Sequence, residues 1–218
     1  ISAETVGRSE EIIGRWISKN KTRRSDFILA TKHSGKGLSH VRNGAPITKD
    51  TIQNAVEGSL KRLKTDYIDL YQFHWPNRGS YMFRQNWKYD PSRQDKKSTL
   101  ENMYECLVIL QKQVDKGNIR YFGLSNESAW GTANWLKLSE QHNLPRVATI
   151  QNEYSLLCRL YDTDLAELSV NEGVGLMAFS PLAAGLLTGK YLDGNLPENS
   201  RKLINQDLGG RDNSRSEM

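Results

Sequence analysis

The sequence contains only two cysteines in 218 residues, Cys106 and Cys158. They stand far apart and show no metal-ligand spacing, which argues against a disulfide scaffold and a metal site and favours a reducing, cytoplasmic environment. The sequence also lacks any apolar run of roughly 18 residues, so we predict no membrane-spanning helix. Its first residues, Ile1 to Glu4, resemble neither a signal peptide nor a transit peptide. Together these absences exclude the secreted disulfide-rich and membrane-embedded classes.

The excess of positive charge is also small, because the sequence has 30 Lys and Arg residues and 25 Asp and Glu residues, a net charge of +5. The densest basic run, from Lys19 to Arg24, is interpreted as a solvated loop between a helix and a strand. A nucleic-acid-binding patch is the alternative, but the run lacks the motif or interleaved aromatics that such a patch needs. We therefore predict no nucleic-acid partner.

Apolar residues recur at helical and strand spacings along most of the chain. The helical spacing predicts helices over residues 8–19, 48–63, 99–116, 128–142 and 161–172. Short apolar runs predict strands over residues 27–31, 67–74, 119–125, 147–151 and 174–180. Between them, residues 77–97 are interpreted as a long polar and aromatic loop, and residues 193–218 as an irregular tail.

Strands that alternate with helices are typical of an α/β protein with a parallel sheet. An open doubly wound sheet and a closed (β/α)8 TIM barrel both fit this pattern. The doubly wound sheet is expected to carry Gly-x-Gly-x-x-Gly after a strand, and no such motif occurs. Polar residues instead crowd the strand ends, which meet at the mouth of a barrel. We predict one incomplete barrel domain over residues 1–218.

Lys32 and His74 follow consecutive predicted strands, so a parallel sheet would set them side by side. Taken singly, a lysine at a strand end is more often a solvated charge, and a lone histidine is more often structural. As a pair they are candidates for catalysis. A buried ammonium lowers the pKa of a neighbouring acid, and an imidazole can donate a hydrogen bond to a carbonyl oxygen.

Further polar positions suit a flat ligand that carries phosphate. Tyr154 could stack on a flat ring, with core packing as the alternative. Small residues over 180–190 let backbone N–H groups approach phosphates, and Lys190 would add a positive charge, unless the segment is a flexible loop. Three polar residues at strand ends are candidates to bind a carboxamide group, and the alternative is that they only cap loops. They are Ser125, Asn126 and Gln151.

Six motifs in this order resemble the aldo-keto reductase family. They are Ala30-Thr31-Lys32, Ser59-Leu60-Lys61-Arg62-Leu63, Asp66-Tyr67-Ile68-Asp69-Leu70-Tyr71, His74-Trp75-Pro76, Gly117-Asn118-Ile119-Arg120-Tyr121-Phe122-Gly123-Leu124-Ser125-Asn126 and Ser180-Pro181-Leu182. The resemblance covers about residues 5–192. It is nearest to the bacterial Tas-like branch, which is related to potassium-channel β-subunits, and the run from Gln151 to Leu157 belongs to that likeness.

The resemblance implies a (β/α)8 barrel of which roughly strands 3 to 7 are present, with NADP(H) bound in extended form. It implies an NADPH-dependent oxidoreductase that transfers hydride to a small-molecule aldehyde or ketone, with Lys32 and His74 as catalytic residues. It also implies cofactor-binding roles for Ser125, Asn126, Gln151, Tyr154, Ser180, Leu182, Gly185, Lys190 and, more weakly, Arg201.

The family's catalytic aspartate and tyrosine would precede the helix at 8–19, and this sequence begins after that point. We therefore expect the chain as given to be inactive by itself. The alternative hypotheses are a non-catalytic NADPH-sensing regulatory subunit and an inactive fragment. Substrate selectivity is expected to depend on the 77–97 loop, whose aromatic residues either line an apolar pocket or lie exposed. They are Tyr81, Phe83, Trp87 and Tyr89.

Overall fold

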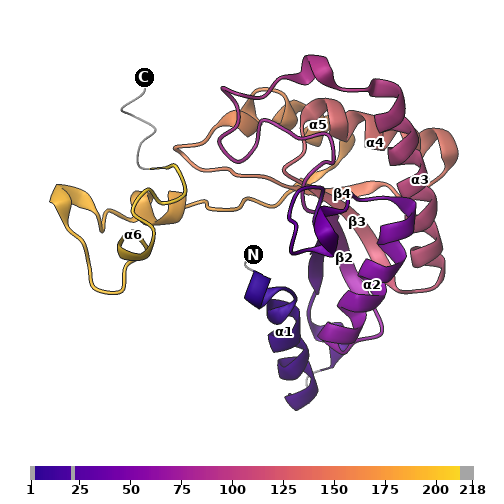
Figure 1. The fold of residues 1–218 in the computed structure, drawn as a ribbon, viewed down its shortest axis with the longest axis horizontal. Coiled ribbons are helices and arrows are strands. Elements are labelled where there is room, and N and C mark those ends of the chain that lie inside the picture. The colour runs from indigo at the N-terminus through magenta and orange to yellow at the C-terminus, as the bar shows by residue number, and fades with distance from the viewer. Residues whose placement is uncertain (1–2, 21–22, 212–218) are drawn as a thin grey trace.

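The computed structural model describes residues 3–20 and 23–211, which form a parallel sheet of five strands covered by helices (Figure 1). The strands are β1 (Ala30–His33), β2 (Ile68–Phe73), β3 (Ile119–Ser125), β4 (Val147–Gln151) and β5 (Gly175–Leu176). The helices are α1 (Arg8–Lys19), α2 (Lys49–Leu63), α3 (Lys96–Asp115), α4 (Ala129–His142), α5 (Leu165–Glu172) and the short α6 (Arg201–Ile204).

The five strands follow one another across the sheet in chain order, and every neighbouring pair is parallel. A doubly wound sheet would reverse its strand order partway, whereas the wall of a barrel keeps chain order throughout. The predicted α/β class with alternating parallel strands is therefore confirmed, and the strand order is that of a barrel wall.

The first strand begins later than the prediction of 27–31. Residues Arg24–Asp26 form a 3-10 turn, and the Phe27 ring packs edge-on against Trp16 at 5.9 Å between ring centroids. Strand pairing is assigned only from Ala30 onward, so Lys32 lies inside β1 rather than after it. An apolar run predicts burial more reliably than it predicts strand pairing.

The last predicted strand, 174–180, is also shorter in the structure. Only Gly175–Leu176 pairs with β4, and Phe179 makes a single bridge to Glu153. Helix α5 begins at Leu165 instead of residue 161, because a separate 3-10 turn precedes it.

Helix α3 starts at Lys96, before the predicted residue 99, because the Asp95 side chain accepts a hydrogen bond from Ser98 N at 3.0 Å. The long loop is therefore the 77–95 loop. The predicted tail contains a 3-10 turn (Leu192–Gly194) and α6, and its residues 212–218 lie outside the described residues, as do 21 and 22 of the basic run.

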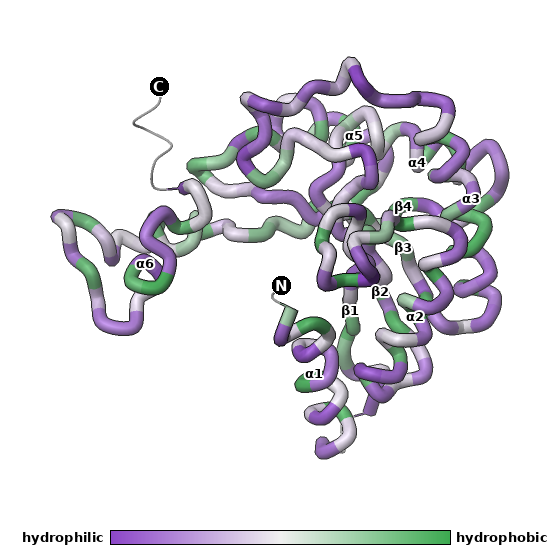
Figure 2. Tube along the Cα trace, viewed as in Figure 1, coloured by the Kyte–Doolittle hydropathy of each residue, from purple (hydrophilic) through white to green (hydrophobic). Residues whose placement is uncertain are grey.

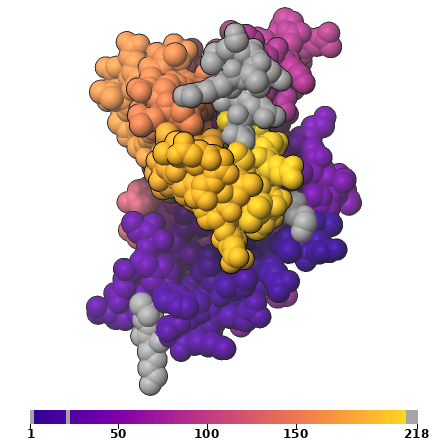
Figure 3. All heavy atoms as spheres, turned by 90° about the vertical axis from the view of Figure 1, so that its left-hand side faces the viewer, coloured from indigo at the N-terminus to yellow at the C-terminus, as the bar shows by residue number. Residues whose placement is uncertain are grey.

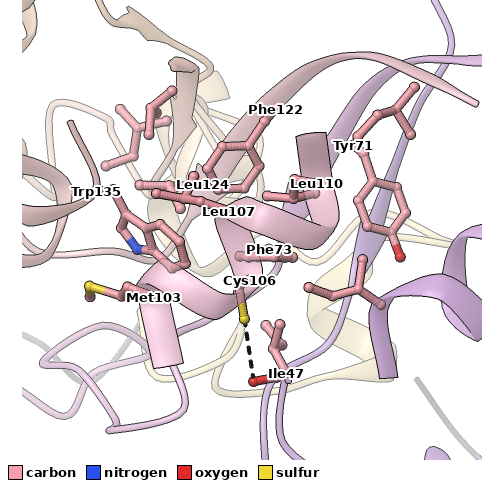
Figure 4. Close-up of a cluster of buried hydrophobic side chains, with 14 of the residues drawn as sticks. Ile47, Tyr71, Phe73, Met103, Cys106, Leu107, Leu110, Phe122, Leu124 and Trp135 are labelled. Carbon is pink, nitrogen blue, oxygen red and sulfur yellow. Dashed lines mark hydrogen bonds between the residues drawn. The ribbon is translucent and has the colours of Figure 1, made fainter. Parts of the chain in front are cut away.

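The core lies between the sheet and the helices α2, α3 and α4. Phe73, Phe122 and Trp135 form its aromatic centre, with ring centroids 5.0 to 5.6 Å apart (Figure 4). Cys106 is fully buried beside them and donates to Ile47 O at 3.9 Å, and both it and Cys158 are free thiols. Figure 2 shows hydrophobic stretches of the chain in the central strands and hydrophilic residues recurring along the helices and loops around them. None of the helices in the described ranges is both long and apolar enough to cross a membrane.

Helix α1 crosses α2 at Gly14, and the helices approach closely there. A Cβ atom at Gly14 would lie 2.2 Å from Arg62 O and 2.9 Å from the Leu63 carbonyl carbon, so it would collide with rigid backbone. We expect Gly14→Ala to lower the free energy of unfolding by about 1–3 kcal/mol in urea denaturation.

Gly58→Ala is the matched control. The three nearest contacts of a Cβ atom there would all be guanidinium atoms of Arg62, the nearest at 3.0 Å. This helical substitution should be neutral or stabilise by about 0.5–1 kcal/mol. Equal effects of the two alanines would contradict the proposed backbone contact between α1 and α2.

Candidate active site

The sheet has one face packed on helices and an opposite face that carries most of the predicted site. Alternate residues of a strand point to opposite faces. Tyr71, Phe73 and Phe122 belong to the helix-covered core. Lys32 pairs with Gln72 across the sheet, and Ser125 pairs with Gln151. Along their strands, these four residues alternate with the core-facing residues, so they lie on the opposite face of the sheet.

Lys32 and His74 are brought together by strand pairing, because His74 N donates to His33 O at 2.9 Å and so continues the β1–β2 ladder. Both residues line a cleft of about 900 Å³ beside α1. Burial lowers the pKa of Lys32. Burial, and then the charge of Lys32, lower the pKa of His74 to about 4. His74 is therefore a neutral imidazole at pH 7, able to donate one hydrogen bond.

The ends of β3 and β4 form one hydrogen-bonded cluster. Ser125 Oγ donates to Gln151 O at 2.8 Å, and Asn126 Nδ2 donates to His74 O at 2.9 Å. Asn126 has a left-handed backbone (φ 53°) that turns its side chain into this cluster. Asn126 Oδ1 and Gln151 Oε1 are buried and have no hydrogen-bond partner within the described part of the chain. Two buried acceptors without donors fit the NH₂ group of a ligand carboxamide.

Tyr154 packs against the hydrophobic core. Its ring is 5.7 Å from the Tyr161 ring, and the Arg159 guanidinium is also 5.7 Å from it. The structure thus places Tyr154 in the packing layer, which was the alternative reading of this residue.

The sequence reasoning missed an aromatic residue, Phe179, on the Gln72 face of the sheet. Met177 accepts a hydrogen bond from Gln72 Nε2 at 3.9 Å, so it lies on the Gln72 face of the sheet. Phe179 follows two residues later along extended chain, so its side chain lies on the same face of the sheet. The alternation within the segment after Val174 was the available signal.

The segment after Phe179 makes a compact series of turns. Left-handed φ angles occur at Ser180, Ala183, Ala184, Gly185 and Gly189. At Gly185 a Cβ atom would lie 2.8 Å from Lys190 Cε and 3.0 Å from its Nζ, so glycine allows the lysine to cross the backbone there. The structure therefore brings Gly185 and Lys190 together, with Leu182 exposed beside them. A lysine ammonium held against backbone suits an anionic group.

Arg201 begins α6 in the C-terminal arm, which we define as residues 181–211. The next residue, Lys202, donates from its backbone N to Tyr191 Oη at 3.2 Å, and the Tyr191 ring lies beside Gly185. Figure 1 shows α6 standing away from the strand ends.

An apolar groove of about 440 Å³ lies next to the cleft and is lined by Leu38, Trp75, Met82 and Phe83 among others. The Trp75 ring is 4.6 Å from the His74 ring, so the groove adjoins His74. Of the loop aromatics, only Phe83 lines it. Tyr81 and Tyr89 pack on each other at 6.3 Å, and Trp87 is 86% exposed.

Comparisons with known proteins agree over almost the whole chain. The model of the aldo/keto reductase family matches residues 2–213. Protein tas from Escherichia coli (strain K12) is 41% identical over 204 residues, which are 92% of this chain and 58% of that protein. An aldo-keto reductase from Babesia bovis is 39% identical (83% and 66%), and a probable voltage-gated potassium channel subunit beta from Arabidopsis thaliana is 34% identical (89% and 53%). The chain spans between about half and two thirds of the length of these relatives.

Proposed function

The chain belongs to the aldo/keto reductase family, and from this we propose that the protein is an NADPH-dependent oxidoreductase that reduces aldehyde or ketone carbonyls to alcohols. The observation that carries the proposal is the juxtaposition of a half-buried lysine, a neutral histidine and two partnerless amide oxygens on one face of a parallel sheet. The lysine and the histidine could polarise a substrate carbonyl group. The two amide oxygens could accept hydrogen bonds from the carboxamide on a cofactor ring. We also propose that the five strands are strands 3 to 7 of the barrel and that the protein is cytoplasmic.

Each side chain then has a role. A bound nicotinamide cofactor supplies the hydride. Asn126 Oδ1 and Gln151 Oε1 accept hydrogen bonds from its carboxamide, and Phe179 is a better candidate than Tyr154 for stacking on its ring. Lys190, crossing Gly185, holds a phosphate oxygen.

At the carbonyl, neutral His74 donates a hydrogen bond to the oxygen and so stabilises the negative charge that develops there. The Lys32 ammonium would lower the pKa of the group that donates the proton to that oxygen, which the family resemblance implies to be a tyrosine. The groove beside Trp75 and Phe83 favours a substrate whose carbonyl carries an apolar group.

Cofactor binding is the direct test, and NADPH quenching of tryptophan fluorescence measures it, since Trp75 adjoins His74. We expect saturable, micromolar binding. Gln151→Leu should weaken it roughly tenfold, because the carboxamide loses one buried acceptor. Gln53→Leu is the matched control, since Gln53 lies on the exposed surface of α2 and donates to Glu57 Oε1 at 2.9 Å. No binding by the unaltered chain would contradict the cofactor proposal, and equal affinities would contradict the role of Gln151.

A second candidate function is NADPH sensing without turnover, which the similarity to a potassium channel subunit beta supports. Both candidates predict the same binding curve. They differ in a carbonyl reduction assay on the full-length protein, in which a sensing subunit binds NADPH without consuming it.

A further inference from the structure

Glu153 lies two residues past β4 and joins two segments that are distant in sequence. Its Oε1 atom accepts hydrogen bonds from Arg84 Nη2 at 2.9 Å and from Arg211 Nε at 2.8 Å. Arg84 belongs to the 77–95 loop, and Arg211 belongs to the C-terminal arm. One carboxylate oxygen is therefore the meeting point of both segments.

The three side chains are largely withdrawn from solvent, since the exposed fractions are 9% for Glu153, 11% for Arg211 and 31% for Arg84. Buried charges interact strongly and depend on their partners. Without the Glu153 carboxylate, two guanidinium groups would face each other with no negative charge between them. Loss of either arginine would leave the carboxylate with one ligand fewer.

Within the C-terminal arm, Arg211 also contacts Ser180, where the proposed phosphate-binding segment (residues 180–190) begins. Arg211 Nη2 donates to Ser180 Oγ at 3.2 Å, and its Nη1 donates to Leu208 O at 2.8 Å. Leu208 is fully buried and anchors the arm. Figure 3 shows the arm, at the orange to yellow end of the colour range, nearest the viewer and in front of the rest of the molecule. Arg211 therefore connects the C-terminal arm to Ser180 by a hydrogen bond.

The loop side leads to the apolar groove. Phe83, which lines the groove, and Arg84 both have left-handed backbones, with φ of 58° and 63°. Two such residues in succession are strained and persist only where the surroundings hold them. The Arg84–Glu153 bond supplies that restraint, so its release would let Phe83 leave its place in the groove.

We infer that Glu153 is a positioning residue that couples the C-terminal arm to the 77–95 loop, so that order at the proposed cofactor segment is transmitted to the proposed substrate groove. The identity of the two ligands rests on the proposed function. The coupling itself is a property of the chain without ligands.

Hydrogen exchange with mass spectrometry on the whole chain tests the coupling, because both segments contain hydrogen-bonded amides. Arm reporters include Leu203 N and Asn205 N, and loop reporters include Lys88 N and Tyr89 N. We expect Arg84→Ala to speed exchange in the arm, and Arg211→Ala to speed it in the loop, each by about tenfold. Glu153→Ala should speed exchange in both.

Arg93→Ala is the matched control, since Arg93 lies in the same loop and pairs with Asp90 at the surface, 89% exposed. It should change neither segment. If each arginine loosened only its own segment, Glu153 would be a local contact and the coupling would be overturned. The two arginine variants keep the test decisive should Glu153→Ala fail to fold.

Added NADPH separates this inference from the proposed function. Where the cofactor binds, exchange in the loop should slow in the unaltered chain but not in Arg211→Ala, and slowing in both would overturn the inference. Where NADPH does not bind, the proposed function fails, yet the cross-effects of Arg84→Ala and Arg211→Ala without ligand still support or overturn the coupling.

Discussion

Glu127→Ala is expected to lower the free energy of unfolding by about 3–5 kcal/mol, because it removes one partner of a buried ion pair. Glu127 is 2% exposed, and the Arg78 side chain that donates to both its carboxylate oxygens is 7% exposed. The carboxylate also accepts from Ser128 N at 2.7 Å at the start of α4. Without the Glu127 carboxylate, the Arg78 guanidinium would be buried between the 77–95 loop and the end of β3 without a negative charge beside it.

Urea denaturation measures this change, and Glu101→Ala is the matched control. Glu101 pairs with Lys97 on the surface of α3 at 3.9 Å and is 65% exposed, so its removal should cost less than about 0.5 kcal/mol. The double variant Arg78→Met with Glu127→Leu should recover much of the loss, since no buried charge is then left alone. A loss from Glu127→Ala as small as that of the control would show that water reaches the pair.

The protein is expected to lose stability between pH 7 and pH 4, with His33 as the largest single cause. His33 is 1% exposed, and burial followed by the charge of Arg42 lowers its pKa to about 3. The unfolded chain binds a proton near the ordinary histidine pKa of about 6.5, whereas the folded chain does not until about pH 3. Stability is therefore full above about pH 6.5 and is lost as pH falls toward 3, by roughly 3 kcal/mol between pH 7 and 4.

Unfolding curves at several pH values test this slope. His33→Gln should reduce the slope between pH 6.5 and 4 by about half, because no group at that position then titrates. The remaining slope should come from His74, whose pKa is lowered by burial to about 4. An unaltered slope in His33→Gln would show that His33 is not the group responsible.

Local patterns in the sequence were sufficient for most of the architecture. Helices α1, α2 and α4 were predictable because apolar residues recur at 3.6-residue spacing. Thr48 and Ser128 also precede α2 and α4 as capping residues. Strands β3 and β4 match their predicted bounds. The proximity of Lys32 and His74 also followed from the sequence, since consecutive parallel strands lie side by side and end at the same edge.

Tertiary structure alone decided the rest. The late start of β1 and the packing of Tyr154 against the core depend on which surfaces meet, and strand propensity does not encode that. The junction of Arg84, Glu153 and Arg211 left no local signal at all, because its parts come from three separate segments. Short-range periodicity determines helices and strands, whereas pairs of charges and packed rings are selected only when the folded chain removes them from water.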